Sequence, residues 1–292
     1  MSESRSHWAG TVTAPASSEL AREVVIAPTR GWPALRLDEI SAYRELLYFL
    51  VWRDVKVRYK QTALGVAWAV LQPLLTVFVF TVFFNRVGGI TVKGVPYVLF
   101  SLSGMIPWLF FANGVTIASA SVVTNVNLVT KVYFPRLVIP IASVLSNLPD
   151  VAIGLGLLLV VMAAYGTAPA VAILAVPLIL VLVFASALAV SLWLSALSVE
   201  FRDVRYVVPL LVQLWLLASP VAYSISKIGG TWKTVLALNP MTGSLGLFRW
   251  AMLGLNAPPA STIAVSCAVT IVTLVGGAYY FRAMERKFAD IA

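Results

Sequence analysis

Long stretches of the sequence contain no charged residue, and this pattern constrains the fold more than any other feature. The stretch between Lys60 and Arg86 has 25 such residues, which form roughly 37 Å of helix against a bilayer core of about 30 Å. Charged residues make up 11% of the 292-residue chain, less than half of the share of about 25% that is typical of soluble domains. We therefore expect an all-α protein that is embedded in a membrane.

Hydropathy and helix-breaking residues divide the chain into six expected spans. The clearest breakers are the segment 166–170, which contains Gly166 and Pro169, and the segment 256–259, which ends in two prolines. The expected spans cover residues 62–85, 97–121, 138–165, 171–197, 206–226 and 260–282, within a transmembrane domain at 61–285. Six spans place both chain termini on the same side of the membrane.

Lysine and arginine residues near the span ends predict the orientation. Eleven lie on the side of the termini and five on the other side, namely Arg86, Lys93, Lys227, Lys233 and Arg249. Because the side richer in positive residues faces the cytoplasm, both termini are expected there.

Residues 1–37 lack the apolar core of a signal peptide. We expect them to be a disordered cytoplasmic tail, and 286–292 to be a short second tail.

The segment 38–60, before the first span, has a helical apolar pattern. Ile40, Tyr43, Leu47 and Leu50 recur at intervals of three and four residues, so they share one helical face. This pattern predicts an amphipathic helix at the membrane interface. The alternative is a cytoplasmic helix without membrane contact.

The segment 227–259, between the fifth and sixth spans, is too apolar for a solvated loop, and its apolar part is too short to span the membrane. Asn239-Pro240 breaks it, because the residue before a proline disfavours the helical conformation. We expect two short re-entrant helices in the outer leaflet, with Asn239 and Pro240 as gate candidates, provided that protein or water covers the break. The alternative is an ordinary surface loop.

Asp150 is the one acid inside an uncharged stretch. Such a residue costs at least about 2.5 to 3.5 kcal/mol in a bilayer unless it is paired or hydrated. We interpret Asp150 as a polar latch between helices; the alternative is a proton site.

One cysteine, Cys267, and one histidine, His7, predict no metal site. The net charge of +9 is interpreted as membrane topology rather than nucleic-acid binding.

Four motifs in a consistent order carry a family resemblance. They are the run 53–68 with the following Leu71-Gln72-Pro73-Leu74, then Lys131-Val132-Tyr133-Phe134-Pro135-Arg136, Phe201-Arg202-Asp203, and Asn239-Pro240. Over residues 50–285 the chain resembles the permease subunits of ABC exporters for polysaccharides, the branch that handles O-antigen, capsule, teichoic acid or galactan.

The resemblance implies a transporter subunit of the cytoplasmic (inner) membrane and not an enzyme. It implies a homodimer, a separate ABC ATPase subunit that uses ATP and Mg, and a lipid-linked glycan as substrate. The sequence itself contains no G-x-x-x-x-G-K-[ST] loop, so no nucleotide or other cofactor is expected on this chain. Two alternatives are an ABC permease for a drug or small lipid and, more remotely, a membrane enzyme that acts on lipid phosphates.

The motifs supply the candidate site residues. Arg58 and Lys60 flank Tyr59 at the mouth of the first span and are candidates for the substrate's anionic lipid headgroup; the alternative is that they only anchor the topology. By resemblance, Lys131, Tyr133, Phe134 and Arg136 belong to a coupling helix, with both aromatics as anchors in the ATPase; the alternative is a simple turn. Two interpretations also remain for Glu200, Arg202 and Asp203, a second ATPase contact or mutual salt bridges.

Overall fold

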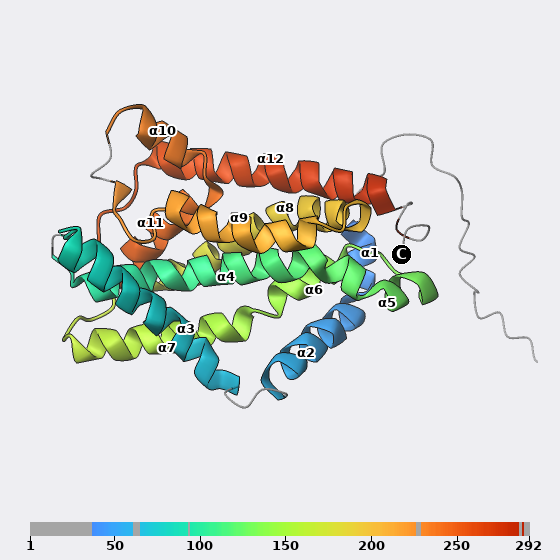
Figure 1. Ribbon diagram of the computed structural model, residues 1–292, viewed down its shortest axis with the longest axis horizontal. Helices are drawn as coiled ribbons and strands as arrows, with labels where there is room; N and C mark the ends of the chain where they lie inside the picture. Colours follow the sequence, from blue (N-terminus) through green and yellow to red (C-terminus); the bar gives the residue numbers. More distant parts are fainter. Residues whose placement is uncertain (1–36, 61–64, 93, 226–228, 286–287, 289–292) are drawn as a thin grey trace, which may run out of the picture. The chain divides into compact units, whose positions relative to one another are not determined.

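The computed structural model describes residues 37–60, 65–92, 94–225, 229–285 and 288. The expected tails, 1–37 and 286–292, lie outside these ranges except for Leu37 and Phe288. The described residues form helices joined by turns and loops and contain no β-strand, and the successive elements are shown in Figure 1. The expected all-α fold is thus confirmed for this part of the chain.

The helices of the first half are α1 (Leu37–Ala42), α2 (Arg44–Lys60), α3 (Gly65–Phe80) with a π-helical extension at Thr81–Val87, α4 (Tyr97–Thr124), α5 (Val126–Lys131), α6 (Val138–Leu145) and α7 (Leu148–Ala164). Those of the second half are a 3₁₀ turn at Val171–Ala175, α8 (Val176–Glu200), α9 (Val204–Ala218), α10 (Thr231–Ala237), α11 (Pro240–Leu253) and α12 (Ala260–Met284).

Five helical segments are long and apolar enough to cross a membrane: Val66–Val87, Tyr97–Thr124, Val138–Ala164, Val171–Glu200 and Ala260–Met284. They match five of the six expected spans. The remaining expected span, 206–226, is shorter than predicted, because α9 ends at Ala218 after 15 residues. A helix of this length rises about 22 Å, less than the bilayer core of about 30 Å.

Helix α4 forms the centre of the structure and contacts α3, α6, α7, α8, α9 and α11. Within its most apolar window 83% of the residues are buried inside the protein, against 17% to 33% for the other four segments. Those four therefore present much of their apolar surface outward. This arrangement is expected of a bundle whose solvent is lipid, because outward-facing apolar side chains cost nothing there.

Small residues allow the helices to approach closely. A Cβ atom at Gly277 of α12 would lie 2.8 Å from Cδ1 of Trp193 on α8, so only glycine fits there. The Trp193 indole donates a hydrogen bond to the carbonyl of Thr273 at 2.9 Å and stacks on Tyr280 with 4.9 Å between the ring centres. Together these contacts join α8 to α12.

The apolar face that was predicted in 38–60 packs on protein. Leu50 is buried, and Ile40, Tyr43 and Leu47 are partly buried against the core, where α2 contacts α6. Elsewhere on α2 the side chains of Tyr48, Phe49 and Trp52 are more than half exposed. The helix is therefore apolar on more than one side, which corrects the simple amphipathic pattern expected from the sequence.

Candidate functional site

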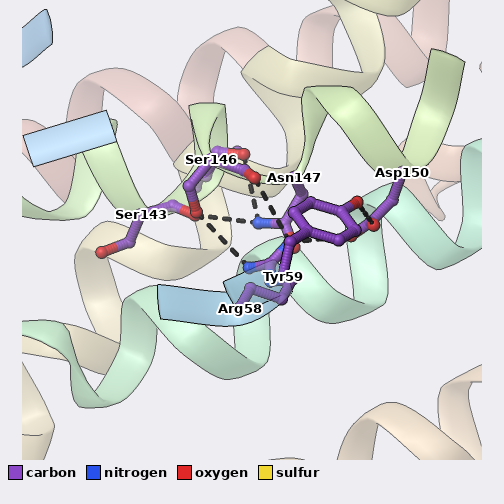
Figure 2. Close-up of polar contacts among 7 residues, drawn as sticks. Arg58, Tyr59, Ser143, Ser146, Asn147 and Asp150 are labelled. Carbon is purple, nitrogen blue, oxygen red and sulfur yellow. Dashed lines mark hydrogen bonds and ion pairs between the residues drawn. The ribbon is translucent and has the colours of Figure 1, made fainter. Parts of the chain in front are cut away.

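The candidate site lies where the third membrane segment is interrupted. Residues Ser146 and Asn147 separate α6 from α7, and Pro149 lacks the N–H that would bond the carbonyl four residues back. Side chains complete the broken end, because Ser146 Oγ donates to the Ser143 carbonyl at 2.9 Å and Asn147 Nδ2 donates to the same carbonyl at 2.8 Å. The break places Asp150 in the first turn of α7 (Figure 2).

Asp150 accepts hydrogen bonds from two side chains in the last turn of α2. Nη1 of Arg58 lies 2.7 Å from Asp150 Oδ2 and 3.2 Å from the Ser146 carbonyl, while the Tyr59 hydroxyl donates to Asp150 Oδ1. The Arg58 and Asp150 side chains are 25% and 23% exposed. This ion pair joins two helices that are 92 residues apart in the sequence.

The environment keeps the Tyr59 phenol protonated. Burial raises its pKa above the ordinary value, and the hydrogen bond to Asp150 and the charge of that carboxylate raise it further. The phenol therefore acts as a donor to Asp150 at any physiological pH. The carboxylate is bound by one cationic and one neutral donor.

A cavity of about 540 Å³ begins at this cluster and continues between α3, α4 and α7. Its size falls within the range of about 300 to 1,000 Å³ found for small-molecule sites. The polar lining residues are Arg58, Tyr59, Gln72, Asn113, Asn147 and Asp150. The others are Trp68, Ala69, Pro73, Ile106, Leu109, Phe110, Ile117, Val151 and Gly154.

The structure brings Arg58, a headgroup candidate, into contact with Asp150, the expected polar latch. Lys60 is exposed and does not line the cavity. Arg58 is thus engaged with a carboxylate of the protein, and its contact with an anionic lipid headgroup stays a prediction. In the described ranges, no three His, Cys, Asp or Glu side chains are grouped closely enough to hold a metal ion.

The two aromatic residues of the segment expected to couple to an ATPase differ in exposure. Tyr133 is 79% exposed, whereas Phe134 is only 5% exposed and packs in this chain's own core. Arg136 donates to the Glu285 carbonyl at the end of α12, and its backbone N–H bonds Glu285 Oε1 at 3.1 Å. The expectation that both aromatics serve as anchors for a partner is therefore corrected, since only Tyr133 is accessible.

Lys131, Glu200, Arg202 and Asp203 are exposed. Within the described residues no ion pair joins Glu200, Arg202 and Asp203 to one another, so the alternative of mutual salt bridges is not observed. These side chains remain available on the surface.

The expected break at Asn239-Pro240 separates α10 from α11. Asn239 caps α11, with its Oδ1 accepting from the Met241 N–H at 3.0 Å and its Nδ2 donating to Ser219 Oγ at 2.8 Å. Pro240 and most of α11 are buried. The segment is therefore not an ordinary solvated loop.

The sequence places Arg249 among the positive residues of the outer loops, but in the structure it is buried and holds neighbouring backbone segments together. It is 5% exposed and donates to the carbonyls of Pro220, Val221 and Phe100 at 2.7, 2.5 and 3.3 Å. Its guanidinium carbon lies 3.7 Å from the ring centre of Phe100. The apolar neighbours in Leu247-Phe248-Arg249-Trp250-Ala251-Met252 were the sequence signal that it is buried.

Comparison with known proteins gives consistent matches. Residues 45–253 match the model of the ABC-2 type transporter family. An O-antigen export system permease protein of Myxococcus xanthus is 32% identical over 254 residues, which cover 86% of this chain and 97% of the relative. Two permease proteins of the same description from Klebsiella pneumoniae are each 27% identical, over 85% of this chain and 95% of theirs.

Proposed function

Because the chain belongs to the ABC-2 type transporter family, we propose that it is the membrane permease subunit of an ATP-driven exporter of a lipid-linked polysaccharide. The observation that carries this proposal is the match, over 85% to 86% of this chain and 95% to 97% of the relatives, to permeases of O-antigen export systems. The family is one of transporters, which argues against a membrane enzyme acting on lipid phosphates.

The proposed placement is in the cytoplasmic membrane with six crossings and both termini in the cytoplasm. Helix α9 is the fifth crossing in chain order, completed by the apolar residues Pro220, Val221 and Ala222, which are buried although they are not helical. Non-helical backbone is tolerated at membrane depth where protein covers it. Helices α10 and α11 form the re-entrant pair, since α11 is covered by α4, α8 and α12.

The exposed aromatics Tyr48, Phe49 and Trp52 support an interfacial position for α2. Aromatic side chains favour the headgroup region, and Lys56 and Lys60, exposed on the same helix, favour anionic lipid there. The second copy of the permease in the proposed homodimer and the ATPase, which would bind ATP and Mg, complete the exporter.

Deletion of the gene that encodes this chain tests the proposal. We expect the polysaccharide to disappear from the cell surface while its lipid-linked form accumulates on the inner leaflet, because synthesis continues without export. A strain with a hydrolysis-deficient partner ATPase should give the same result, and re-expression of the chain should restore the surface glycan. Normal surface glycan in the deletion strain, together with a loss of drug or small-lipid export, would contradict it.

Docking of the ATPase is expected to depend on Tyr133. The Tyr133→Ala variant should lose about 2 kcal/mol of binding, roughly thirtyfold in affinity, if the exposed ring is an interface anchor. Co-purification of the ATPase measures this loss, and thermal unfolding of the permease should not change.

Two matched variants make the docking test specific. Tyr165→Ala removes a tyrosine that is 51% exposed, from the other end of the membrane segment, and should leave ATPase binding intact. Phe134→Ala should instead destabilise the permease itself by about 3 to 5 kcal/mol, because it empties a core position. Equal ATPase binding by wild type and Tyr133→Ala would exclude this residue as an anchor.

A further inference from the structure

The cavity beside the Arg58–Asp150 pair changes in polarity along its length. At one end lie the ion pair, Tyr59 and Ile117, and at the other end Ile106 lies against Gly154, where an added Cβ would be 3.2 Å from the isoleucine. Ile106 and Ile117 are eleven positions apart in the sequence, which corresponds to about 16 Å along α4. The cavity is therefore polar at the α2 end and apolar toward the middle of the membrane segments.

Two amides between these ends have no side-chain hydrogen-bond partner among the residues that the structure describes. The Gln72 side chain of α3 and the Asn113 side chain of α4 line the cavity, and neither makes a side-chain hydrogen bond within the described residues. Both lie in membrane-crossing segments. A polar group in such surroundings costs free energy unless it finds a hydrogen-bonding partner.

A third amide has its acceptor oxygen unpaired. Asn147 Nδ2 donates to the carbonyls of Ser143 and Val144 at 2.8 and 3.2 Å, which fixes the orientation of the amide, because the reversed orientation would oppose oxygen to oxygen. Its Oδ1 is buried without a hydrogen-bond partner in the described structure. The polar half of the cavity thus offers unused hydrogen-bonding capacity from three side chains.

We propose that this cavity binds an amphiphile, with one apolar chain between α3, α4 and α7 and a hydrogen-bonding head at the end formed by Arg58, Asp150 and Asn147. The occupant is the lipid carrier of the exported glycan, an assignment that rests on the proposed function. The head enters the cavity beside α2, and the chain contacts Leu109, Phe110 and Val151. A bulk phospholipid shares this chemistry and is distinguished by the experiment.

The test uses the permease–ATPase complex in proteoliposomes and two lipids with a diazirine in the acyl or prenyl chain. One probe is a polyprenyl diphosphate bearing a single sugar, and the other is phosphatidylglycerol. After illumination, labelled peptides are mapped by mass spectrometry. We expect the prenyl probe to label the α4 and α7 peptides that contain Leu109 and Val151, and unlabelled carrier to compete.

Two alanines on α3 provide a matched pair of variants. Ala69 lines the cavity, whereas Ala67, two residues earlier, is exposed and does not line it. Ala69→Phe should reduce labelling about tenfold by filling the cavity, and Ala67→Phe should not change it. Gln72→Met keeps the length of the side chain and should reduce labelling about fivefold through the lost hydrogen bond. If Ala69→Phe fails to fold, the Gln72→Met variant still tests the proposal.

Each contrary outcome has a separate meaning. Equal labelling of Ala69→Phe and Ala67→Phe would overturn the cavity as a binding site. Labelling by phosphatidylglycerol that carrier cannot displace would overturn the carrier as occupant. If Ala69→Phe abolishes labelling but surface glycan is exported at the normal rate, the cavity is not used in export, and the proposed function is unaffected. Loss of both labelling and export in Ala69→Phe, but not in Ala67→Phe, supports the proposal.

Discussion

Replacement of Arg249 with methionine is expected to reduce the yield of folded permease about tenfold or more. The guanidinium holds the carbonyls of Phe100, Pro220 and Val221, and hydrogen bonds to a charged group contribute about 1.5 to 3 kcal/mol each. Methionine fills similar space but leaves those carbonyls buried without donors. Size-exclusion chromatography of the detergent-solubilised chain, followed by thermal unfolding, measures the loss.

Two variants define the cause of this loss. Arg249→Lys keeps the charge but has a single nitrogen and cannot hold three carbonyls in one plane, so we expect an intermediate yield. Arg86→Met removes an exposed arginine at the end of the π-helical segment and should have no effect. A folded yield for Arg249→Met equal to that of Arg86→Met would show that the three carbonyls do not need this side chain.

Asp150→Leu is expected to abolish export and to destabilise the junction of α2 and α7. It removes the carboxylate from Arg58 and Tyr59 and leaves a partly buried cation, which is more harmful than removal of both charges. Arg58→Leu should also destabilise, because a lone acid at this depth costs about 2.5 to 3.5 kcal/mol. The Arg58→Leu/Asp150→Leu double variant should regain stability but not export, since the polar end of the cavity is lost.

A double-mutant cycle in thermal or denaturant unfolding gives the coupling between the two residues, expected at about 1 to 3 kcal/mol. The neighbouring pair Arg53–Asp54, at 2.8 Å on the more exposed surface of α2, is the control and should give a coupling below about 1 kcal/mol. Equal coupling for both pairs would contradict a special role of Asp150.

The membrane segments could be predicted from the sequence because hydropathy is a local property. Gly166 and Pro169 separated the third and fourth segments, and Pro240 marked the start of α11, since proline and glycine act on their immediate backbone. The predicted fifth span was too long, because the residues after Ala218 are apolar through contact with protein and not through helical membrane crossing. Hydropathy alone does not distinguish an apolar segment that is buried in protein from one that crosses the membrane as a helix.

Contacts between distant residues could not be predicted in the same way. The ion pair of Arg58 and Asp150 depends on how α2 packs against α6 and α7, which no local pattern specifies. The exposure of Tyr133 and the burial of Phe134 differ because adjacent side chains point in different directions, and one sequence does not reveal which direction is inward. Arg249 was misplaced because a count of positive residues assumes that each is solvated.

The central position of α4 has a consequence for biogenesis. This helix is synthesised before most of the helices that later enclose it, and it contains the buried serines Ser101, Ser103, Ser119 and Ser121. Each donates its hydroxyl to a carbonyl three or four residues earlier in the same helix. The nascent helix can therefore leave the translocon with these hydroxyls already paired, and α6, α7, α8, α9 and α11 pack against it as they emerge.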